Sequence, residues 1–388
     1  MGLVLPQEEF DGRIETLAKR VADAGLDAVL VHSDEADFAN VRYLSDYWPV
    51  FERAAVVVGA GGKAVQVIGP ESGEYALDRS RLKSIHKLVC YRESAEPDYP
   101  DIPVSNFRKV FEEACEGKPP KKVGVVGWGI FPHAIHEEMS EAIPGVKIVK
   151  ADDLVIGMRM VKSPREIEML KESFRVSQIA VDAVIAEVKP GMTELQAVGI
   201  AQRAFFGAGA ESESHPQYCL AGRNSAHAIS RPSHRVIKKG DLVQLDIGGR
   251  VAGYSGSIGR PICVGGKMTD MMKKLAEFGI KAHYKTHQMM QLGRPAREVA
   301  TEYDAWVRRE GFGEYLLYGP CHGLGLIEVE RPWVEKTSTY KFQENMTFQI
   351  DTFFWCSEFG VRYENGLRIA PGKGELMSEK RMEVIEVK

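Results

Sequence analysis

Acidic side chains stand inside apolar, strand-like segments in the second half of this chain. Asp246 lies in the segment 242–247, Asp351 ends the segment 347–351, and Glu364 ends the segment 360–364. An ionised carboxylate in an apolar setting is costly unless it is paired, hydrogen-bonded or bound to a cation. His322 stands in a further apolar segment, beside glycine. These four side chains predict a fold that brings them together in one site.

A helix start divides the chain at residues 163–166. Ser163 suits a helix N-cap, Pro164 suits the first helical turn, and Glu166 completes a capping box. Before this point, helical and strand-like patterns alternate. Helices are predicted over 14–24 and 132–143, and strands over 28–31, 54–58, 64–68, 123–126 and 146–149. We therefore expect a small α/β domain over residues 1–155.

The remaining residues, 156–388, show a different order of elements. Two helices up to about residue 207 precede strands at 218–221, 242–247 and 258–264. Helices follow at 270–291 and 296–310, and strands continue toward the end of the chain. This order predicts an α+β fold rather than a doubly wound sheet.

Charge and composition exclude several classes of protein. Lys and Arg number 50 against 54 Asp and Glu, a net charge of −4 that offers no field to hold a nucleic acid. No segment reaches the roughly 18 apolar residues of a membrane helix, and the first residues do not resemble a signal peptide. The six cysteines form no C-x-x-C pair and are expected to be reduced thiols. We expect a cytoplasmic protein with no membrane or nucleic-acid partner.

Motifs in a fixed order identify a resemblance that spans nearly the whole chain. Residues 159–166 have the form R-x-x-K-S-x-x-E, and a D-x-G strand segment at 246–248 follows Gly240-Asp241. Further matches lie at 253–260, 322–326, 344–351 and 360–364. This order resembles peptidase family M24, the creatinase, prolidase and aminopeptidase P superfamily. The resemblance implies a pita-bread fold in the C-terminal domain, preceded by a smaller creatinase-type N-terminal domain.

The resemblance also implies a set of site residues. It places possible metal ligands at Asp246, His322, Asp351 and Glu364. Catalytic roles fall on His227, His322, Glu330, Asp351 and Glu364, and substrate contacts on His215, Tyr47, Trp48, Phe353 and Arg362. A turn at residues 40–45 resembles the one after which a family aromatic reaches the partner subunit's site, so Tyr47 or Trp48 would do so in a homodimer.

Several positions depart from the family pattern. Peptidases of the family hold two divalent ions that are bridged by carboxylates. Here Ser257 stands at the position of a bridging aspartate, Val329 replaces a histidine, and Asp351 replaces a glutamate. A neutral hydroxyl is a poor substitute for a bridging carboxylate. We therefore predict a degenerate metal site that binds either no cofactor or one divalent ion of Mn, Co or Zn.

Three functions are compatible with these residues. In the first, a creatinase-like hydrolase cleaves a C–N bond of a small amide, guanidino or amidine substrate with little or no help from metal. His227 would be its general acid or base, and Asp351 and Glu364 would hold a cationic substrate. In the second, the chain is a metal-dependent Xaa-Pro dipeptidase or aminopeptidase. In the third, it is a non-catalytic binding protein or a lyase on the same fold.

Overall fold

The computed structural model describes residues 3–388 and divides into an N-terminal domain, Leu5–Arg159, and a C-terminal domain, Met160–Lys388. The sequence predicts the division between residues 155 and 156, a position that lies inside helix α6 (Asp152–Arg159). The structure completes this helix before the second domain begins. Within residues 3–388, no helix has both the length and the apolar character needed to cross a bilayer.

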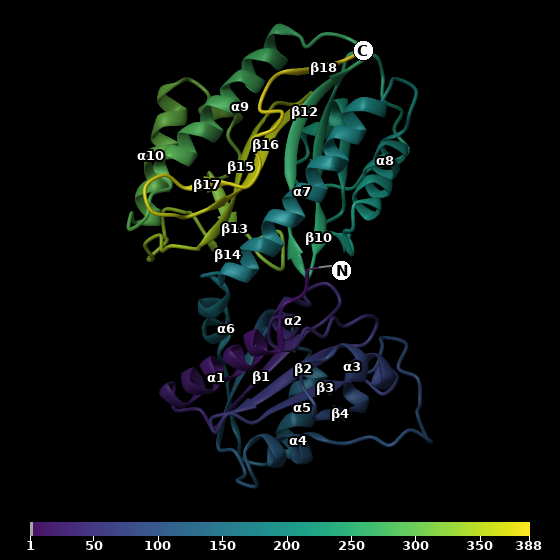
Figure 1. Ribbon diagram of the computed structural model, residues 1–388, viewed down its shortest axis with the longest axis vertical. Helices are drawn as coiled ribbons and strands as arrows, with labels where there is room; N and C mark the ends of the chain where they lie inside the picture. The colour runs from purple at the N-terminus through teal and green to yellow at the C-terminus, as the bar shows by residue number, and fades with distance from the viewer. Residues whose placement is uncertain (1–2) are drawn as a thin grey trace. The chain divides into compact units, whose positions relative to one another are not determined.

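A six-stranded mixed sheet forms the centre of the N-terminal domain (Figure 1). The order is β4-β3-β2-β1-β5-β6, in which β1 pairs antiparallel with β2 and parallel with β5. The five strands predicted from the sequence are present. The three-residue strand β4 was not predicted, because it is short and only half-buried. The bounds are β1 Ala28–Ser33, β2 Ala54–Gly59, β3 Ala64–Ile68, β4 Ile85–Lys87, β5 Lys122–Val126 and β6 Lys147–Lys150.

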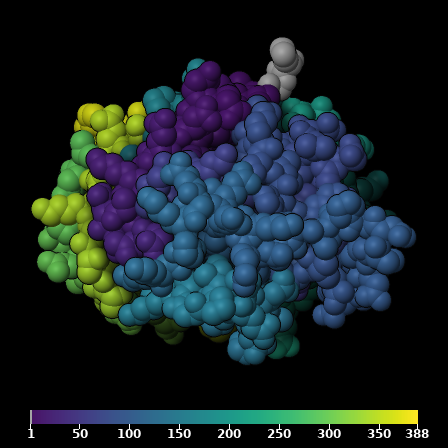
Figure 2. All heavy atoms as spheres, turned by 90° about the horizontal axis from the view of Figure 1, so that it is seen from below, coloured from purple at the N-terminus to yellow at the C-terminus, as the bar shows by residue number. Residues whose placement is uncertain are grey.

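Helices cover this sheet through apolar faces. Phe107 and Phe111 of α4 pack with Met139 of α5 against Leu30 and Val57 of the sheet. In Figure 2 the purple atoms of the beginning of the chain lie beside blue atoms of later segments of the same domain. The beginning and the end of the domain also meet, because Arg20 donates a hydrogen bond of 2.9 Å to the carbonyl of Leu154. The helices are α1 Gln7–Asp23, α2 Ala39–Ser45, α3 Gly73–Arg79, α4 Phe107–Ala114, α5 His133–Ala142 and α6 Asp152–Arg159.

His32 of β1 is buried between aromatic rings. Its ring centroid lies 5.6 Å from that of Tyr91 and 5.2 Å from that of Phe131. Burial lowers the pKa of His32 from its ordinary value of 6.5 to about 4. The unfolded chain therefore binds a proton at this residue at a higher pH than the folded chain does. Stability is lost as the pH falls from 6.5 toward 4.

Replacing His32 with asparagine is expected to flatten this pH dependence. Because one pKa unit corresponds to 1.36 kcal/mol, His32 accounts for about 3 kcal/mol of the stability lost between pH 7 and pH 4. The difference in free energy of unfolding between wild type and His32→Asn, measured by urea denaturation, should change by this amount over that range. The exposed His133 of α5 provides the control variant His133→Asn. A difference that stays constant with pH would contradict the prediction.

The C-terminal domain is built on a curled, nine-stranded sheet (Figure 1). Its main path is β14-β13-β15-β16-β12-β9-β8; β17 pairs with β16, and β18 pairs in parallel with β12. The bounds are β8 Tyr218–Ala221, β9 Asp241–Ile247, β12 Ile258–Val264, β13 Cys321–Gly323, β14 Glu330–Trp333, β15 Thr347–Trp355, β16 Gly360–Arg368, β17 Glu375–Leu376 and β18 Ile385–Val387. A smaller sheet, β11-β10-β7, contains β7 Ser212–Glu213, β10 Gly249–Val251 and β11 Tyr254–Ser255. The largely antiparallel pairing confirms the expected α+β class.

Two pairs of long helices pack against this domain's strands (Figure 1). The helices α7 (Pro164–Glu187) and α8 (Glu194–Gly207) lie together near β8 and β10, whereas α9 (Asp270–Met289) and α10 (Ala296–Arg309) lie on the side of β15 and β16. The predicted capping box is confirmed, because the side chains of Ser163 and Glu166 each accept a hydrogen bond from the other's backbone N–H. Short 3₁₀ turns are η1 Val89–Tyr91, η2 Trp128–Ile130, η3 Gly222–Ala226 and η4 Gly313–Tyr315.

Candidate active site

A row of facing residues crosses the centre of the C-terminal sheet. Asp246 of β9 faces Gly259 of β12, which faces Glu364 of β16, and Glu364 in turn faces Asp351 of β15. Gly259 keeps this row compact, because a Cβ there would lie 2.7 Å from the Cβ of Glu364 and 2.9 Å from the Cγ of Arg362. The sequence predicts that the three acidic residues share a site. Strand register places them next to one another.

The guanidinium of Arg362 lies among these carboxylates. Its Nη1 donates a hydrogen bond of 2.8 Å to Oδ2 of Asp246, and its Nε lies 3.4 Å from Oδ1 of Asp351. Its Nη2 donates to the hydroxyl of Tyr318 at 2.9 Å and to the carbonyl of Ala228 at 2.8 Å. The charge of Arg362 is thus shared between two of the acidic side chains. The predicted role of Arg362 is a substrate contact. In the structure, its guanidinium contacts these residues of the same chain.

Aromatic side chains lie around the guanidinium of Arg362. The ring of Phe353 lies 5.1 Å from the guanidinium carbon of Arg362, and the ring of Tyr218 lies 5.7 Å from it. Phe353 also stacks on Tyr318, with ring centroids 6.0 Å apart. The Tyr318 hydroxyl donates a hydrogen bond to Oδ2 of Asp351. The aromatic rings exclude water from the ion pairs and so strengthen them.

The carboxyl groups differ in how readily they ionise. Burial raises the pKa of Glu364 well above its ordinary value, and repulsion from Asp246, Asp351 and Glu328 raises it further. Burial also raises the pKa of Asp351, against the opposing effect of Arg362. Burial acts in the same direction on Asp246, but His215 and Arg362 outweigh it and lower the pKa of this residue. Asp246 is therefore the ionised partner of the cations around it, and Glu364 most needs a proton or a further cation.

His215 and Ser257 complete the surroundings of Asp246. The Nε2 atom of His215 lies 3.2 Å from Oδ2 of Asp246 and 3.4 Å from Oγ of Ser257. The Ser257 hydroxyl donates a hydrogen bond to Oδ1 of Asp246. Both carboxylate oxygens of Asp246 therefore already have partners within the protein. At the position where a second carboxylate was expected from the family pattern, the chain presents a hydrogen-bond donor.

A second group of side chains surrounds His322 of β13. The Nε2 atom of His322 lies 3.8 Å from Oε1 of Glu328 and 3.9 Å from Oε1 of Glu364. Ligand atoms of these three buried residues all lie within 4.8 Å of one another. Glu328 belongs to the loop between β13 and β14 and is not among the site residues predicted from the sequence. The signal was available, because Glu328 is an acidic residue inside the apolar run 326–329 and obeys the same rule as Asp246.

The remaining catalytic predictions fall in different surroundings. Glu330 of β14 accepts a hydrogen bond of 2.8 Å from Nζ of Lys162, and both side chains are buried. This ion pair favours a structural role for Glu330 over proton transfer. His227 is exposed on the loop after η3; among residues 3–388 its ring hydrogen-bonds Ser230 alone, at 3.3 Å. The structure brings His215, and not His227, into contact with the acidic row.

Tyr47 and Trp48 take part in the packing of the N-terminal domain. Tyr47 is buried beside Tyr75, with ring centroids 5.3 Å apart. Trp48 is half-buried, and its ring lies 4.6 Å from the guanidinium carbon of Arg42. The exposed aromatic of this turn is Phe51, at 76% exposure. The rings of Tyr47 and Trp48 are thus occupied within the domain, and a contact of either with a partner subunit stays a prediction, as does the homodimer.

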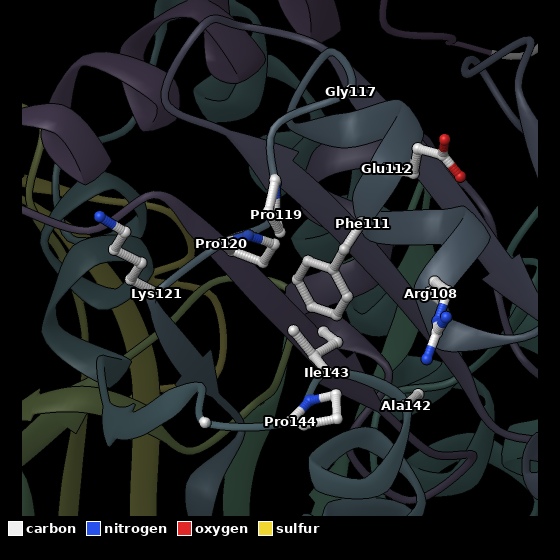
Figure 3. Close-up of a pocket in the computed structure, with 11 residues that line it drawn as sticks. Arg108, Phe111, Glu112, Gly117, Pro119, Pro120, Lys121, Ala142, Ile143 and Pro144 are labelled. Atoms are coloured by element: carbon white, nitrogen blue, oxygen red, sulfur yellow. The ribbon is translucent and has the colours of Figure 1, made fainter.

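A pocket of about 500 Å³ opens on the N-terminal domain, between α4 and the end of α5 (Figure 3). Figure 3 shows Phe111, Ile143 and proline rings around it, with Arg108 and Lys121 at its edge. None of its lining residues is a predicted site residue. The acidic row of the C-terminal domain therefore remains the candidate active site.

Comparison with known proteins identifies the family of both domains. Residues 168–371 match the model of metallopeptidase family M24, and residues 13–161 match that of the creatinase/prolidase N-terminal domain. An Xaa-Pro dipeptidase of Pyrococcus horikoshii is 26% identical over 336 residues, which cover 85% of this chain and 94% of the relative. A creatinase of Bacillus sp. (strain B-0618) is 23% identical over 328 residues, which cover 83% of this chain and 76% of the relative.

Solved structures show the same fold. The X-Pro aminopeptidase of Thermotoga maritima superimposes with a TM-score of 0.83 at 20% identity, covering 96% of this chain and 99% of that one. The prolidase of Pyrococcus horikoshii gives a TM-score of 0.82 at 23% identity, covering 96% of this chain and 100% of that one. The curled antiparallel sheet and the preceding α/β domain are thus the pita-bread and creatinase-type folds predicted from the motifs. The chain belongs to metallopeptidase family M24, whose members are hydrolases that act on C–N bonds.

Proposed function

We propose that this protein hydrolyses the C–N bond of a small dipeptide-like substrate of the Xaa-Pro class. The observation that carries the proposal is the gathering of buried carboxyl groups, those of the acidic row and the neighbouring Glu328, around a single guanidinium. Four carboxyl groups meet there, and Arg362 offsets at most one unit of charge. The site therefore favours a positively charged partner, such as the free amino group of a dipeptide. The names of the Pyrococcus relatives, Xaa-Pro dipeptidases at 26% and 24% identity, support this substrate class over a guanidino compound.

The side chains around Asp246 supply the proton transfer that amide hydrolysis requires. A leaving amine must receive a proton as the C–N bond breaks. His215 contacts Asp246 through Nε2, and its side chain is 14% exposed, so it reaches both the acidic row and the solvent. We assign the proton transfer to this histidine in place of His227. Tyr318 and Arg362, fixed by Asp351 and Asp246, would orient the substrate beside it.

The residues do not fit the paired-ion centre of the family's peptidases. Ser257 adds no charge, and Asp246 already binds a hydroxyl, a guanidinium and an imidazole. These contacts support the degenerate centre that the sequence predicts. Members of the family typically bind divalent metals, and a single bound ion would supply a polarised water or carbonyl group. The group of His322, Glu328 and Glu364 fits one such ion.

A second candidate is the creatinase-like reaction on a guanidino substrate. Oxygen atoms of Asp351 and Glu364, Oδ1 and Oε2, are buried and have no hydrogen-bond partner among the described residues. A guanidinium group presents several N–H donors in a plane and would satisfy such acceptors. A relative at 23% identity is a creatinase.

A substrate panel separates these candidates. The purified protein, with added Zn²⁺, Mn²⁺ or Co²⁺ and separately with a chelator, is incubated with Xaa-Pro dipeptides, matched Xaa-Ala dipeptides and creatine. We expect release of proline from the Xaa-Pro dipeptides, measured by chromatography, and a loss of roughly 100-fold or more in His215→Gln, as for a general acid or base. The exposed His227→Gln is the matched control. Urea release from creatine alone would support the second candidate, and no product from any substrate would contradict both.

A further inference from the structure

We propose that His322, Glu328 and Glu364 form a site for one divalent transition-metal ion, in which Glu328 is a ligand supplied by the loop between β13 and β14. This inference deepens the proposed function by naming the cation site and the residue that completes it. It rests on that function only for the role of the ion, since binding itself is measured without substrate.

The spacing of the three side chains suits an ion between them. The separations of 3.8 and 3.9 Å from His322 Nε2 to Glu328 Oε1 and Glu364 Oε1 are too long for direct hydrogen bonds. Zinc lies about 2.1 Å from nitrogen and oxygen ligands, so two ligands on one ion stand about 3.4 Å apart in tetrahedral geometry and farther apart at wider angles. The observed separations therefore leave room for an ion after a small adjustment.

The orientation of the His322 ring gives an independent reason for a cation. Its Nδ1 atom lies 3.1 Å from the carbonyl oxygen of Gly323. A carbonyl oxygen can only accept, so Nδ1 carries the proton and, in a neutral ring, Nε2 presents its lone pair to the two carboxylates. Metal-binding histidines are commonly held in this way, with the second ring nitrogen donating to a backbone carbonyl.

Unsatisfied oxygen atoms point to the same conclusion. Oε1 of Glu328 and Oε2 of Glu364 are buried and have no hydrogen-bond partner among the described residues. Glu328 is 7% exposed and Glu364 is 1% exposed. Leaving a buried acceptor of this kind unpaired is costly, and more so when it is charged. An ion between Glu328 Oε1 and the lone pair of His322 satisfies the first of these oxygens, and Glu364 adds its carboxylate to the same group.

Arg362 explains why the site takes one ion and not two. It holds Asp246 at 2.8 Å and lies 3.4 Å from Asp351, so a fixed positive charge already occupies that end of the acidic row. A second divalent ion there would be repelled by the guanidinium. At the other end of the row, Glu328 adds a further carboxylate beside His322.

The donor set indicates which ions bind. One imidazole and two carboxylates suit borderline and hard divalent ions such as Zn²⁺, Co²⁺ and Mn²⁺. With three protein ligands, such an ion keeps an open position. The full chain, stripped with chelator and dialysed, is therefore titrated with Zn²⁺ by calorimetry, and its bound zinc is counted by elemental analysis.

We expect one equivalent of Zn²⁺ per chain in the wild type and an affinity loss of at least roughly 100-fold in Glu328→Gln, since even residues behind the ligands cost 10–100-fold. The exposed Glu335→Gln, in the segment after β14, is the matched control and should bind as the wild type does. Asp246→Asn should also retain the equivalent. Two equivalents, none, or undiminished binding by Glu328→Gln would overturn the inference.

Diffraction keeps the test decisive if Glu328→Gln fails to fold. In crystals of the wild-type protein soaked with Zn²⁺, we expect one anomalous peak about 2.1 Å from a carboxylate oxygen of Glu328 and from Nε2 of His322. A peak held by Asp246 and Asp351 instead would overturn the inference. If zinc binds at Glu328 but no Xaa-Pro dipeptide is cleaved, the metal site stands and the proposed substrate falls. If Xaa-Pro dipeptides are cleaved but no metal is bound, the proposed substrate stands and the metal site falls.

Discussion

Replacing Arg362 with methionine is expected to lower the free energy of unfolding of the C-terminal domain by about 3–5 kcal/mol, because it leaves buried charges without their counterion. Asp246 and Asp351 both depend on this guanidinium, at 2.8 and 3.4 Å. Asp351 can respond by taking up a proton, because burial already raises its pKa. Asp246 still has His215 beside it, which also lowers its pKa, so it remains the charge that loses its guanidinium partner. Hydrolysis of the proposed substrate should fall with the stability.

Urea unfolding of Arg362→Met, Arg362→Lys and wild type measures this effect. Lysine restores the charge but cannot donate in several directions at once, so we expect it to recover only part of the lost stability. The control is Arg368→Met on the same strand, where the arginine pairs with Glu375 and Glu344 near the surface. Partly exposed pairs of this kind contribute about 0–1 kcal/mol. Equal stability of Arg362→Met and wild type would show that the acidic row does not need the guanidinium.

The ion pair of Lys162 and Glu330 is expected to behave as a buried unit. Removing either partner, in Lys162→Met or Glu330→Met, should cost about 3–5 kcal/mol of unfolding free energy, because the other charge then remains buried without this counterion. The two side chains are 2% and 6% exposed, and their charged atoms are 2.8 Å apart. The double variant should cost clearly less than the sum of the two single changes, since neither charge then remains.

Denaturation curves for the four members of this cycle give the coupling energy. The surface pair of Lys171 and Glu375, whose side chains are 45% and 40% exposed, provides the matched control. There, Lys171→Met should change the free energy of unfolding by no more than about 1 kcal/mol. Additive costs at Lys162 and Glu330 would contradict the buried-pair interpretation. A loss of turnover in Glu330→Met at unchanged stability would restore the catalytic role that the family pattern suggested for this glutamate.

Both predictions concern charged residues whose roles in the structure differ from the roles that the family pattern suggests. The pattern marks Glu330 as part of the catalytic segment, but the structure gives it a buried lysine as partner. The resemblance gives Arg362 a substrate contact, but the structure places its guanidinium at the centre of the acidic row. Motif membership thus indicates that a residue is near the site. Its partners decide what it does there.

Local order in this protein could be predicted from the sequence because short-range physics determines it. The capping box at Ser163, the hairpin strands at 54–58 and 64–68, and strand 258–264 follow from periodicity and capping, which act over a few residues. The rule that a carboxylate in an apolar strand needs a partner correctly singled out Asp246, Asp351 and Glu364 as residues that meet. The fold class followed from the order of these elements.

The tertiary structure alone decided which partners those residues have. Asp246 and Arg362 are 116 residues apart in the sequence and meet through strand register, which also brings Gly259 between their strands. Glu328 reaches His322 through the course of a loop, which no periodic pattern determines. Because a shift of one residue in register would turn every side chain to the other face of the sheet, the charge balance of the site is a property of the folded chain. The sequence determined which charges are present, and the register of the sheet determined how they are paired.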